Sequence, residues 1–362
     1  MGKTKVFVPD YFEQFRCKCG DCRHPCCDGW GISVKKQEYY SLLGLECSIR
    51  LRHKLDDAFV REDLPTDEAF ASIRPNYLEV CPMLDEDGLC LLQKEKGETV
   101  LPVVCRVYPR SIKDFGAFHE MCMSCSCEET VEVLMQSEAP LTLHETELEL
   151  PFEGLRLYAP DPKKDALRHA VIGLMSDGSR PLVGRLEEIG DLCCPPERYP
   201  SGSRTEALLS LRSFLGALCR RSDGIRAYGE KALAYLGDGE GETMLARFDE
   251  AEAHLYALLP KVEAYAGRFI SNHLLYEGFP YVFDCDDPDT AFAGFCTAVA
   301  LLKLMVVCAM AGKSDLSTFV DVFAFANRFI EHSDYYRLCS RLSHPHGMEV
   351  FARFKPLLDR AK

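Results

Sequence analysis

The chain has 362 residues, of which 47% are apolar, and its formal net charge is −14. A chain of this length can bury large cores without covalent cross-links, and it suggests two domains or one large one. The acidic balance argues against nucleic acid as the main partner, because phosphate binding favours a basic surface. Two interpretations of the acidic balance stay open: it attracts a lysine-rich protein partner, or it only keeps the protein in solution.

The first part of the chain is rich in cysteine. Twelve of the 19 cysteines lie between Cys17 and Cys127, and five of them lie within Cys17–Cys27. Thiols at this density form disulfides or bind a metal or an iron–sulfur cluster. Residues 1–10 contain no apolar run of signal-peptide length, and no stretch of about 18 apolar residues occurs, so we expect a cytoplasmic protein without a membrane span. An odd number of thiols in such a protein favours metal binding.

The expected elements of this first part are short. Apolar residues at helical spacing predict a helix within residues 33–63. Asp87-Gly88, between two apolar pieces, predicts a hairpin that brings Cys81 and Cys90 close together. A second pair of strands is expected around residues 115–118. The cysteines would then lie on loops and short strands.

The rest of the chain reads as helical. Eight prolines between residues 140 and 200 argue against long elements there, except for a helix over 163–175. Apolar stripes predict helices from residue 204 onward, over 244–273 with a kink at Pro260, and over 289–311, 316–331 and 348–358. The longest apolar run, over 298–311, is interrupted by Lys303 and predicts a buried helix. The predicted fold is mainly α: a small cysteine-rich metal-binding domain of short strands and loops (1–130), a connecting region (131–203) and a helical bundle (204–362).

The cysteines and their neighbours follow a specific pattern in four segments: Cys17-x4-Cys22-x3-Cys26-Cys27-x2-Trp30, Cys81-Pro82 with Gly88-Leu89-Cys90, Cys105-x2-Tyr108-Pro109-Arg110, and Ser124-Cys125. This pattern resembles that of the flagellin lysine-N-methylase family. The resemblance implies a [4Fe–4S] cluster, S-adenosylmethionine as the methyl donor, and flagellin or another lysine-bearing protein as the acceptor. It also implies the metal ligands Cys17, Cys22, Cys26, Cys27, Cys81, Cys90, Cys105 and Cys125.

Cys19, Cys122 and Cys127 are among the cysteines of the first part that fall outside the pattern, although Cys127 is an alternative to Cys125 as a ligand. Eight thiolates exceed the four that one cluster or one structural zinc needs, and thiolate chemistry alone admits zinc as readily as iron–sulfur. Neighbouring side chains of an extended backbone point to opposite sides, so Cys26 and Cys27 are expected in different environments. The later cysteines are read as small buried hydrophobes.

Methyl transfer to lysine needs a neutral amine held in line with an electrophilic methyl group. Aromatic side chains suit the cationic sulfonium, and Trp30 and Tyr108 both lie beside cysteines of the pattern. Tyr108 is the candidate catalytic residue. Trp30 and Arg110 are candidates for binding the donor, and Arg110 would bind the donor's carboxylate group. The alternatives are that Trp30 packs over the metal and that residues 108–110 form a turn holding Cys105.

No glycine-rich strand-to-helix motif marks a nucleotide-binding fold, and Gly237–Gly241 is read as a linker between helices. A function of another class stays open beside methyl transfer. The chain could be a non-catalytic, zinc-stabilised protein-interaction module with a helical partner-binding domain. Both functions require a metal, and only the first requires S-adenosylmethionine.

Overall fold

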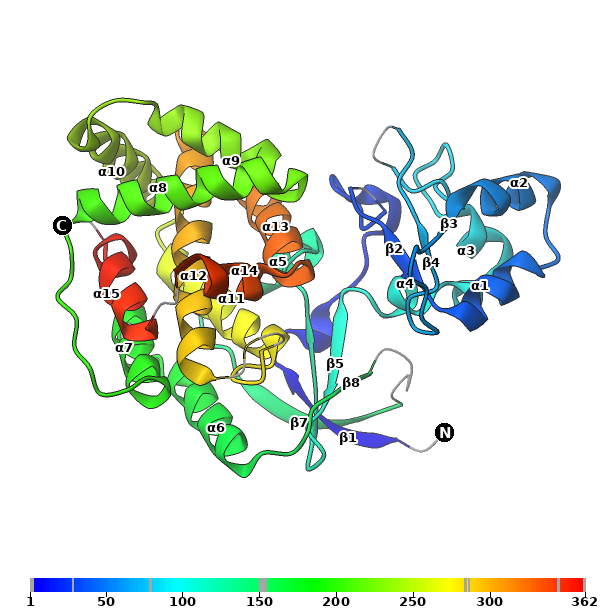
Figure 1. Cartoon of the computed structure of the whole chain (residues 1–362), viewed down its shortest axis with the longest axis horizontal. Helices are drawn as coiled ribbons and strands as arrows, with labels where there is room; N and C mark the ends of the chain where they lie inside the picture. Colours follow the sequence, from blue (N-terminus) through cyan, green and yellow to red (C-terminus); the bar gives the residue numbers. More distant parts are fainter. Residues whose placement is uncertain are drawn as a thin grey trace.

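The computed structural model describes residues 3–27, 29–77, 80–149, 155–282, 285, 287–343 and 346–360. A small lobe, residues 17–107, lies beside a large helical bundle, and the strands of a separate sheet lie next to both (Figure 1). The prediction of a mainly helical fold that follows a region of short strands and loops is confirmed.

The larger sheet has five strands in the order β7-β1-β6-β5-β8. Its strands are β1 Thr4–Pro9, β5 Arg110–Asp114, β6 His119–Met123, β7 Leu143–Leu148 and β8 Leu155–Leu157. The expected strand pair around residues 115–118 is the antiparallel β5–β6 hairpin, where Asp114 lies opposite His119 and Gly116 takes φ +80°. Because β1 pairs with β7, the sheet joins strands from both sides of the boundary predicted at residue 130.

The small lobe has its own apolar core, which includes Val34, Leu51 and Leu55. Its regular elements are β2 Ile32–Val34, α1 Lys36–Leu43, α2 Ile49–Ala58, β3 Phe59–Arg61, β4 Ala71–Ile73, α3 Leu91–Lys96 and α4 Val103–Val107, with 3-10 turns at Cys19–Asp21 and Glu98–Val100. Another 3-10 turn, Phe12–Gln14, precedes the lobe. The predicted helix over 33–63 is thus two helices flanked by strands. The second one begins where the Ser48 side chain accepts a hydrogen bond from the Leu51 backbone N–H.

The predicted turn between Cys81 and Cys90 is present. The Gly88 N–H donates to the carbonyl of Asp85, and Leu84 and Cys90 form an antiparallel bridge. Gly88 has φ +74°, a conformation that glycine adopts without the steric cost of a side chain. The Asp-Gly signal therefore located a turn that returns the chain to Cys81.

The bundle contains most of the predicted helices. Its helices are α5 Glu128–Leu134, α6 Pro162–Ser176, α7 Leu182–Cys193, α8 Arg204–Arg221, α9 Asp223–Leu236, α10 Gly241–Leu258, α11 Val262–Glu277, α12 Pro288–Met310, α13 Ser317–His332, α14 Tyr335–Ser343 and α15 Gly347–Leu358. Pro260 separates α10 from α11 instead of kinking one helix, because proline has no N–H for the helical ladder. The expected linker Gly237–Gly241 does lie between α9 and α10. Helix α7 was not predicted, because Pro181 reads as a breaker but precedes the helix.

Helix α12 is the centre of the bundle, and α7, α8, α9, α10, α13, α14 and α15 pack around it. The Asp287 side chain caps its first turn and Pro288 occupies a first-turn position. In the part of the chain described here, α12 is the one helix long and apolar enough to cross a membrane, with mean hydropathy 2.2, but 94% of that apolar window is buried inside the protein. Lys303 within it pairs with Glu252 at 2.6 Å, so the predicted buried helix is confirmed.

Candidate metal and methyl-transfer site

Cysteines from three segments meet in the small lobe. Cys26 and Cys27 lie on the loop that follows the 3-10 turn Cys19–Asp21, Cys81 and Cys90 flank the turn described above, and Cys105 lies on α4. The Cys81 N–H donates to the Cys27 carbonyl at 2.8 Å, which fixes the first segment against the second. These five residues, Cys26, Cys27, Cys81, Cys90 and Cys105, are called the thiol cluster below.

The thiols of this cluster interact with one another. Cys27 forms side-chain hydrogen bonds with both Cys26 and Cys81, which lower the pKa of each partner to about 7 and raise the pKa of Cys27 itself. Burial is the main cause that raises the pKa of Cys90 and of Cys105. Two thiols of the cluster are thus shifted toward the thiolate, which is the form that binds metal.

Cys26 and Cys27 therefore share one environment, and the expectation that they would serve different ones is wrong. The chain turns at these two residues instead of running extended, so both side chains reach the same side. The alternation of an extended strand does not apply to a turn.

The remaining predicted ligands are Cys17 and Cys22, which precede Cys26 in the chain, and Cys125, which lies in the bundle. Burial is the main cause that raises the pKa of Cys22 to about 12, and the charges of Glu128 and Cys127 contribute. Cys17 accepts a hydrogen bond from the Cys19 N–H at 3.3 Å. Cys125 is 1% exposed in the bundle, where its sulfur accepts from Asn272 at 3.2 Å.

Burial is the main cause that raises the pKa of both Cys125 and Cys127. Smaller contributions differ: Cys26 raises the pKa of Cys127 and Cys127 raises that of Cys22, whereas Glu331 raises the pKa of Cys125. Cys125 and Cys127, which are two residues apart in the chain, thus face different parts of the protein. Of the two alternatives for the fourth segment, the structure places Cys127 nearer the other cysteines.

Among the described residues, no three cysteine, histidine, aspartate or glutamate side chains surround a common point as the ligands of a metal ion would. The donor set nevertheless suits a thiolate-bound centre, because five cysteines converge and one of them, Cys26, affects the pKa of Cys22, Cys27, Cys81, Cys90, Cys105 and Cys127. Side-chain rotation alone can change which sulfurs face one another, so the cluster fits an iron–sulfur or zinc centre by its chemistry.

A group of aromatic and polar side chains lies where the small lobe meets the bundle. The Trp30 ring is 4.8 Å from the His332 ring and 5.6 Å from the Tyr108 ring, centroid to centroid. Trp30 also donates its Nε1–H to the Cys26 carbonyl at 2.6 Å. The group formed by Trp30, Tyr108, Ser124, Ser126 and His332, called the junction site below, therefore adjoins the thiol cluster directly.

Hydrogen bonds connect the junction site to a buried carboxylate. The Tyr108 hydroxyl is 3.0 Å from Ser126 Oγ, and His332 Nε2 is 2.9 Å from Ser126 Oγ and 3.1 Å from Ser124 Oγ. Ser124 in turn donates to Glu331 Oε2 at 2.5 Å. A continuous chain of hydrogen bonds thus leads from Tyr108 to Glu331.

The local environment sets the charge of these groups. Burial by the surrounding protein is the main cause that lowers the pKa of His332 to about 4, so its imidazole is neutral at pH 7. His332 nevertheless keeps a solvent-exposed surface. Burial raises the pKa of Tyr108 well above its usual value, so this phenol stays protonated.

The loop of residues 22–27, which carries Cys22, Cys26 and Cys27 and is called the cysteine loop below, is held against the bundle by ion pairs and hydrogen bonds. Arg23 Nε is 2.7 Å from Asp321 Oδ1 on α13. Arg328, also on α13, donates to the His24 carbonyl at 2.6 Å and lies over the Trp30 ring at 5.2 Å. The buried carboxylate of Glu128 accepts from the backbone N–H groups of Arg23 and His24. The junction site is therefore built by both parts of the protein.

The structure brings together two of the three predicted site residues, Trp30 and Tyr108. Arg110, the third, begins β5 and lies over the Phe15 ring at 5.5 Å. The cation over Trp30 is Arg328, which sequence reasoning missed together with His332 and the two serines. No local signal could have found His332, because more than 200 residues separate it from its serine partners.

Comparison with known proteins finds similarity in sequence to three curated proteins. No family model and no solved structure matches the chain. The chain is 26% identical over 164 residues to proteins named lysine-N-methylase from Salmonella typhimurium and Salmonella choleraesuis, a match that covers 45% of this chain and 41% of each relative. It is also 26% identical over 147 residues to the flagellar biosynthetic protein FliU of Salmonella muenchen, of which the match covers 85%.

The chain thus matches about two fifths of the length of the two lysine-N-methylases. These three relatives confirm that the chain resembles the flagellin lysine-N-methylase family.

Proposed function

We propose that this protein is a lysine N-methyltransferase that uses S-adenosylmethionine, binds a [4Fe–4S] cluster through cysteines of the small lobe, and acts on flagellin in the cytoplasm. The observation that carries the proposal is the junction site, an aromatic group with a neutral histidine that lies directly against the thiol cluster. The names of the relatives support methyl transfer to lysine and a flagellar acceptor.

The thiol cluster would hold the iron–sulfur centre. A cubane cluster takes four thiolates, and Cys26, Cys27, Cys81, Cys90 and Cys105 offer one more than that number. When bound, the cluster would tie the three segments together, and we assign it no step in the transfer. Zinc in the same thiolates would correspond to the non-catalytic alternative.

The junction site suits the cations of the reaction. S-adenosylmethionine supplies a methyl group on a positively charged sulfonium, and aromatic faces such as those of Trp30 and Tyr108 attract such cations. The low pKa of His332 keeps its ring uncharged at pH 7, so the imidazole does not repel them. Tyr108, which stays protonated, would orient the incoming amine by a hydrogen bond and would not act as a base.

The transfer itself requires a neutral amine. The lysine ammonium first loses one proton, and the nitrogen lone pair then forms a bond to the methyl carbon while the carbon–sulfur bond breaks, which leaves S-adenosylhomocysteine. The hydrogen bonds from Ser126 and Ser124 to Glu331 offer a path by which that proton leaves the junction site. Glu331, at the end of this path, is buried.

Calorimetry of donor binding tests the proposal. We expect Trp30→Ala and His332→Asn to weaken S-adenosylmethionine binding at least about tenfold, since each removes an aromatic or polar wall of the site. His53→Asn, an exposed histidine on α2, is the matched control and should bind as the parent does. Parent-like binding by both junction variants would place the donor elsewhere.

A second pair of variants identifies the cation that binds the donor carboxylate. Arg110 was predicted from the sequence, and Arg328 is the arginine that lies over Trp30. Loss of donor binding in Arg110→Ala with binding intact in Arg328→Ala would favour the sequence prediction. The reverse result would favour the arrangement that the structure describes.

A further inference from the structure

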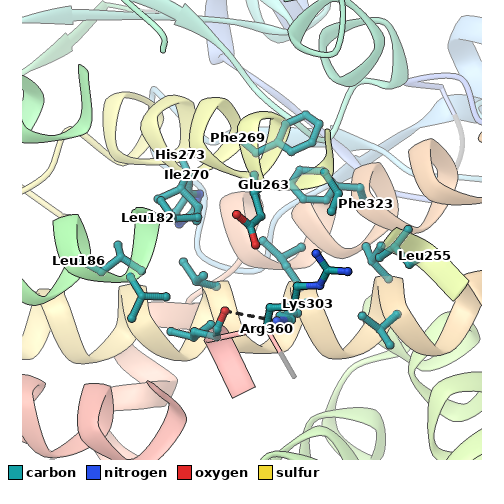
Figure 2. A pocket seen from close by; sticks show the side chains of 18 of the residues that line it. Leu182, Leu186, Leu255, Glu263, Phe269, Ile270, His273, Lys303, Phe323 and Arg360 are labelled. Carbon is teal, nitrogen blue, oxygen red and sulfur yellow. Dashed lines mark hydrogen bonds between the residues drawn. The ribbon is translucent and has the colours of Figure 1, made fainter. Parts of the chain in front are cut away.

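A second site, a cavity, lies inside the helical bundle and reaches Cys125, which stands between Ser124 and Ser126 of the junction site. Its volume is about 180 Å³, and α7, α10, α11, α12, α13 and the end of α15 contribute its walls. Figure 2 shows Leu182 and Leu186 on one side of it, Leu255 and Phe323 on the other, and Ile270 above. The walls are therefore mainly aliphatic and aromatic.

The cavity runs from the surface to the core. Glu263, Asp359 and Arg360 line it where the chain is exposed. At its other end Cys125 and Asn327 are each 1% exposed and His273 is 4% exposed. A molecule entering from the solvent would thus pass charged side chains at the mouth, then apolar walls, and reach a small polar group at the buried end.

One polar atom at the buried end has no partner. Asn327 donates its Nδ2–H to the Phe323 carbonyl at 2.9 Å, but its Oδ1 accepts no hydrogen bond from any residue that the structure describes. The neighbouring polar groups are already engaged: His273 Nε2 is 2.8 Å from the Tyr336 hydroxyl, and Cys125 accepts from Asn272. A buried acceptor without a partner is costly, so this position favours a hydrogen-bond donor.

The charges around the cavity favour a neutral molecule. Lys303 and Arg360 supply two positive charges, and Glu263 and Asp359 supply two negative ones. Lys303 is also paired with Glu252, and the Tyr256 hydroxyl donates to Glu263 at 3.3 Å. Nothing in this balance selects an anion or a cation.

We propose that this cavity binds a neutral aromatic molecule of the size of phenol or indole, whose single O–H or N–H donates to Asn327 Oδ1. An apolar cavity of about 150 Å³ lined by Leu, Ile and Phe is large enough to bind benzene, so about 180 Å³ admits one substituted or fused ring. Phe269 and Phe323, with ring centroids 4.3 Å apart, supply aromatic contacts. The inference does not depend on methyl transfer.

Phenol and toluene are the probes, because they have nearly the same shape and differ in the donor. Calorimetry on the full-length protein should find phenol bound about fivefold more tightly than toluene, the effect of one hydrogen bond. Toluene is the more hydrophobic of the two, so a cavity without a polar partner would prefer toluene. Equal or tighter binding of toluene, or no binding of phenol at millimolar concentration, would overturn the proposal.

Two variants locate the site. Asn327→Leu keeps the volume and removes the acceptor, so we expect the preference for phenol to disappear while toluene still binds. Val299→Phe fills the cavity and should abolish binding of both probes, whereas Leu209→Phe, at an exposed leucine of α8, should leave both affinities unchanged. Phenol binding to Val299→Phe with parental affinity would contradict the assignment. If the variants do not fold, the comparison of phenol with toluene on the parent protein still decides.

Discussion

Glu277, at the end of α11, is a buried carboxyl group whose charge opposes folding. It is 8% exposed, and burial raises its pKa from 4.5 to about 7, while the nearby Glu331 adds to the shift and His273, Arg156 and Lys113 oppose it. The unfolded chain releases this proton near pH 4.5, but the native protein keeps it until about pH 7. The contribution of Glu277 to stability is therefore present at low pH and is lost as pH rises between these values.

The size of the effect follows from that interval. Each tenfold change in proton concentration is worth about 1.4 kcal/mol, so the interval from pH 4.5 to about 7 corresponds to at most about 3.5 kcal/mol. Glu277→Gln keeps the shape of the side chain but cannot ionise. We expect this variant to match the parent near pH 4.5 and to be more stable by about 2 to 3 kcal/mol at pH 8.

Urea unfolding followed by circular dichroism at pH 4.5, 6 and 8 measures this difference. Glu263→Gln is the matched control, because Glu263 lies on the same helix and is exposed. The control should show no comparable gain. A Glu277→Gln variant that is equally stable with the parent at pH 8, or less stable, would refute the reasoning about this buried carboxyl.

Two further predictions concern the predicted metal ligands and the cysteine loop. Cys90→Ser and Cys22→Ser should lower the iron, sulfide or zinc content of anaerobically purified protein and destabilise the small lobe, since ligand binding is part of its folding energy; Cys47→Ser, outside the pattern, should keep the metal, and an undiminished content in both ligand variants would contradict metal binding. Arg328→Ala should loosen the cysteine loop, because it removes a hydrogen bond to the His24 carbonyl and the contact with Trp30; hydrogen exchange of the loop should rise, and unchanged protection would contradict this account.

The sequence located elements whose signals are local. Asp87-Gly88 predicted a turn that is present, and the apolar run over 298–311 predicted a buried helix that is now α12. It missed the strands β1 and β7, because their pairing joins residues far apart in the chain and neither strand carries a long alternating pattern. Helix α9 lies in the region predicted to be helical from residue 204 onward, but its bounds were not predicted, although its Ser222 side chain accepts a hydrogen bond from the Gly224 N–H.

Only part of the candidate site was predictable from the sequence. Trp30 and Tyr108 each stand beside a cysteine of the pattern, and the structure does bring their rings together. His332 and Arg328 come from a helix whose sequence reads as an ordinary amphipathic helix, so only the docking of the small lobe on α13 gives them a role. Residues whose function depends on packing between distant segments carry no signal of their own.

Methyl transfer to a lysine is the central claim, and mass spectrometry tests it directly. Anaerobically purified protein is incubated with flagellin and S-adenosylmethionine carrying a labelled methyl group, and tryptic peptides are searched for labelled methyl-lysine. The account predicts labelled lysines with the parent protein, and their loss with Tyr108→Phe but not with Tyr77→Phe, an exposed tyrosine of the small lobe. Donor binding without transfer to any lysine of flagellin would contradict it.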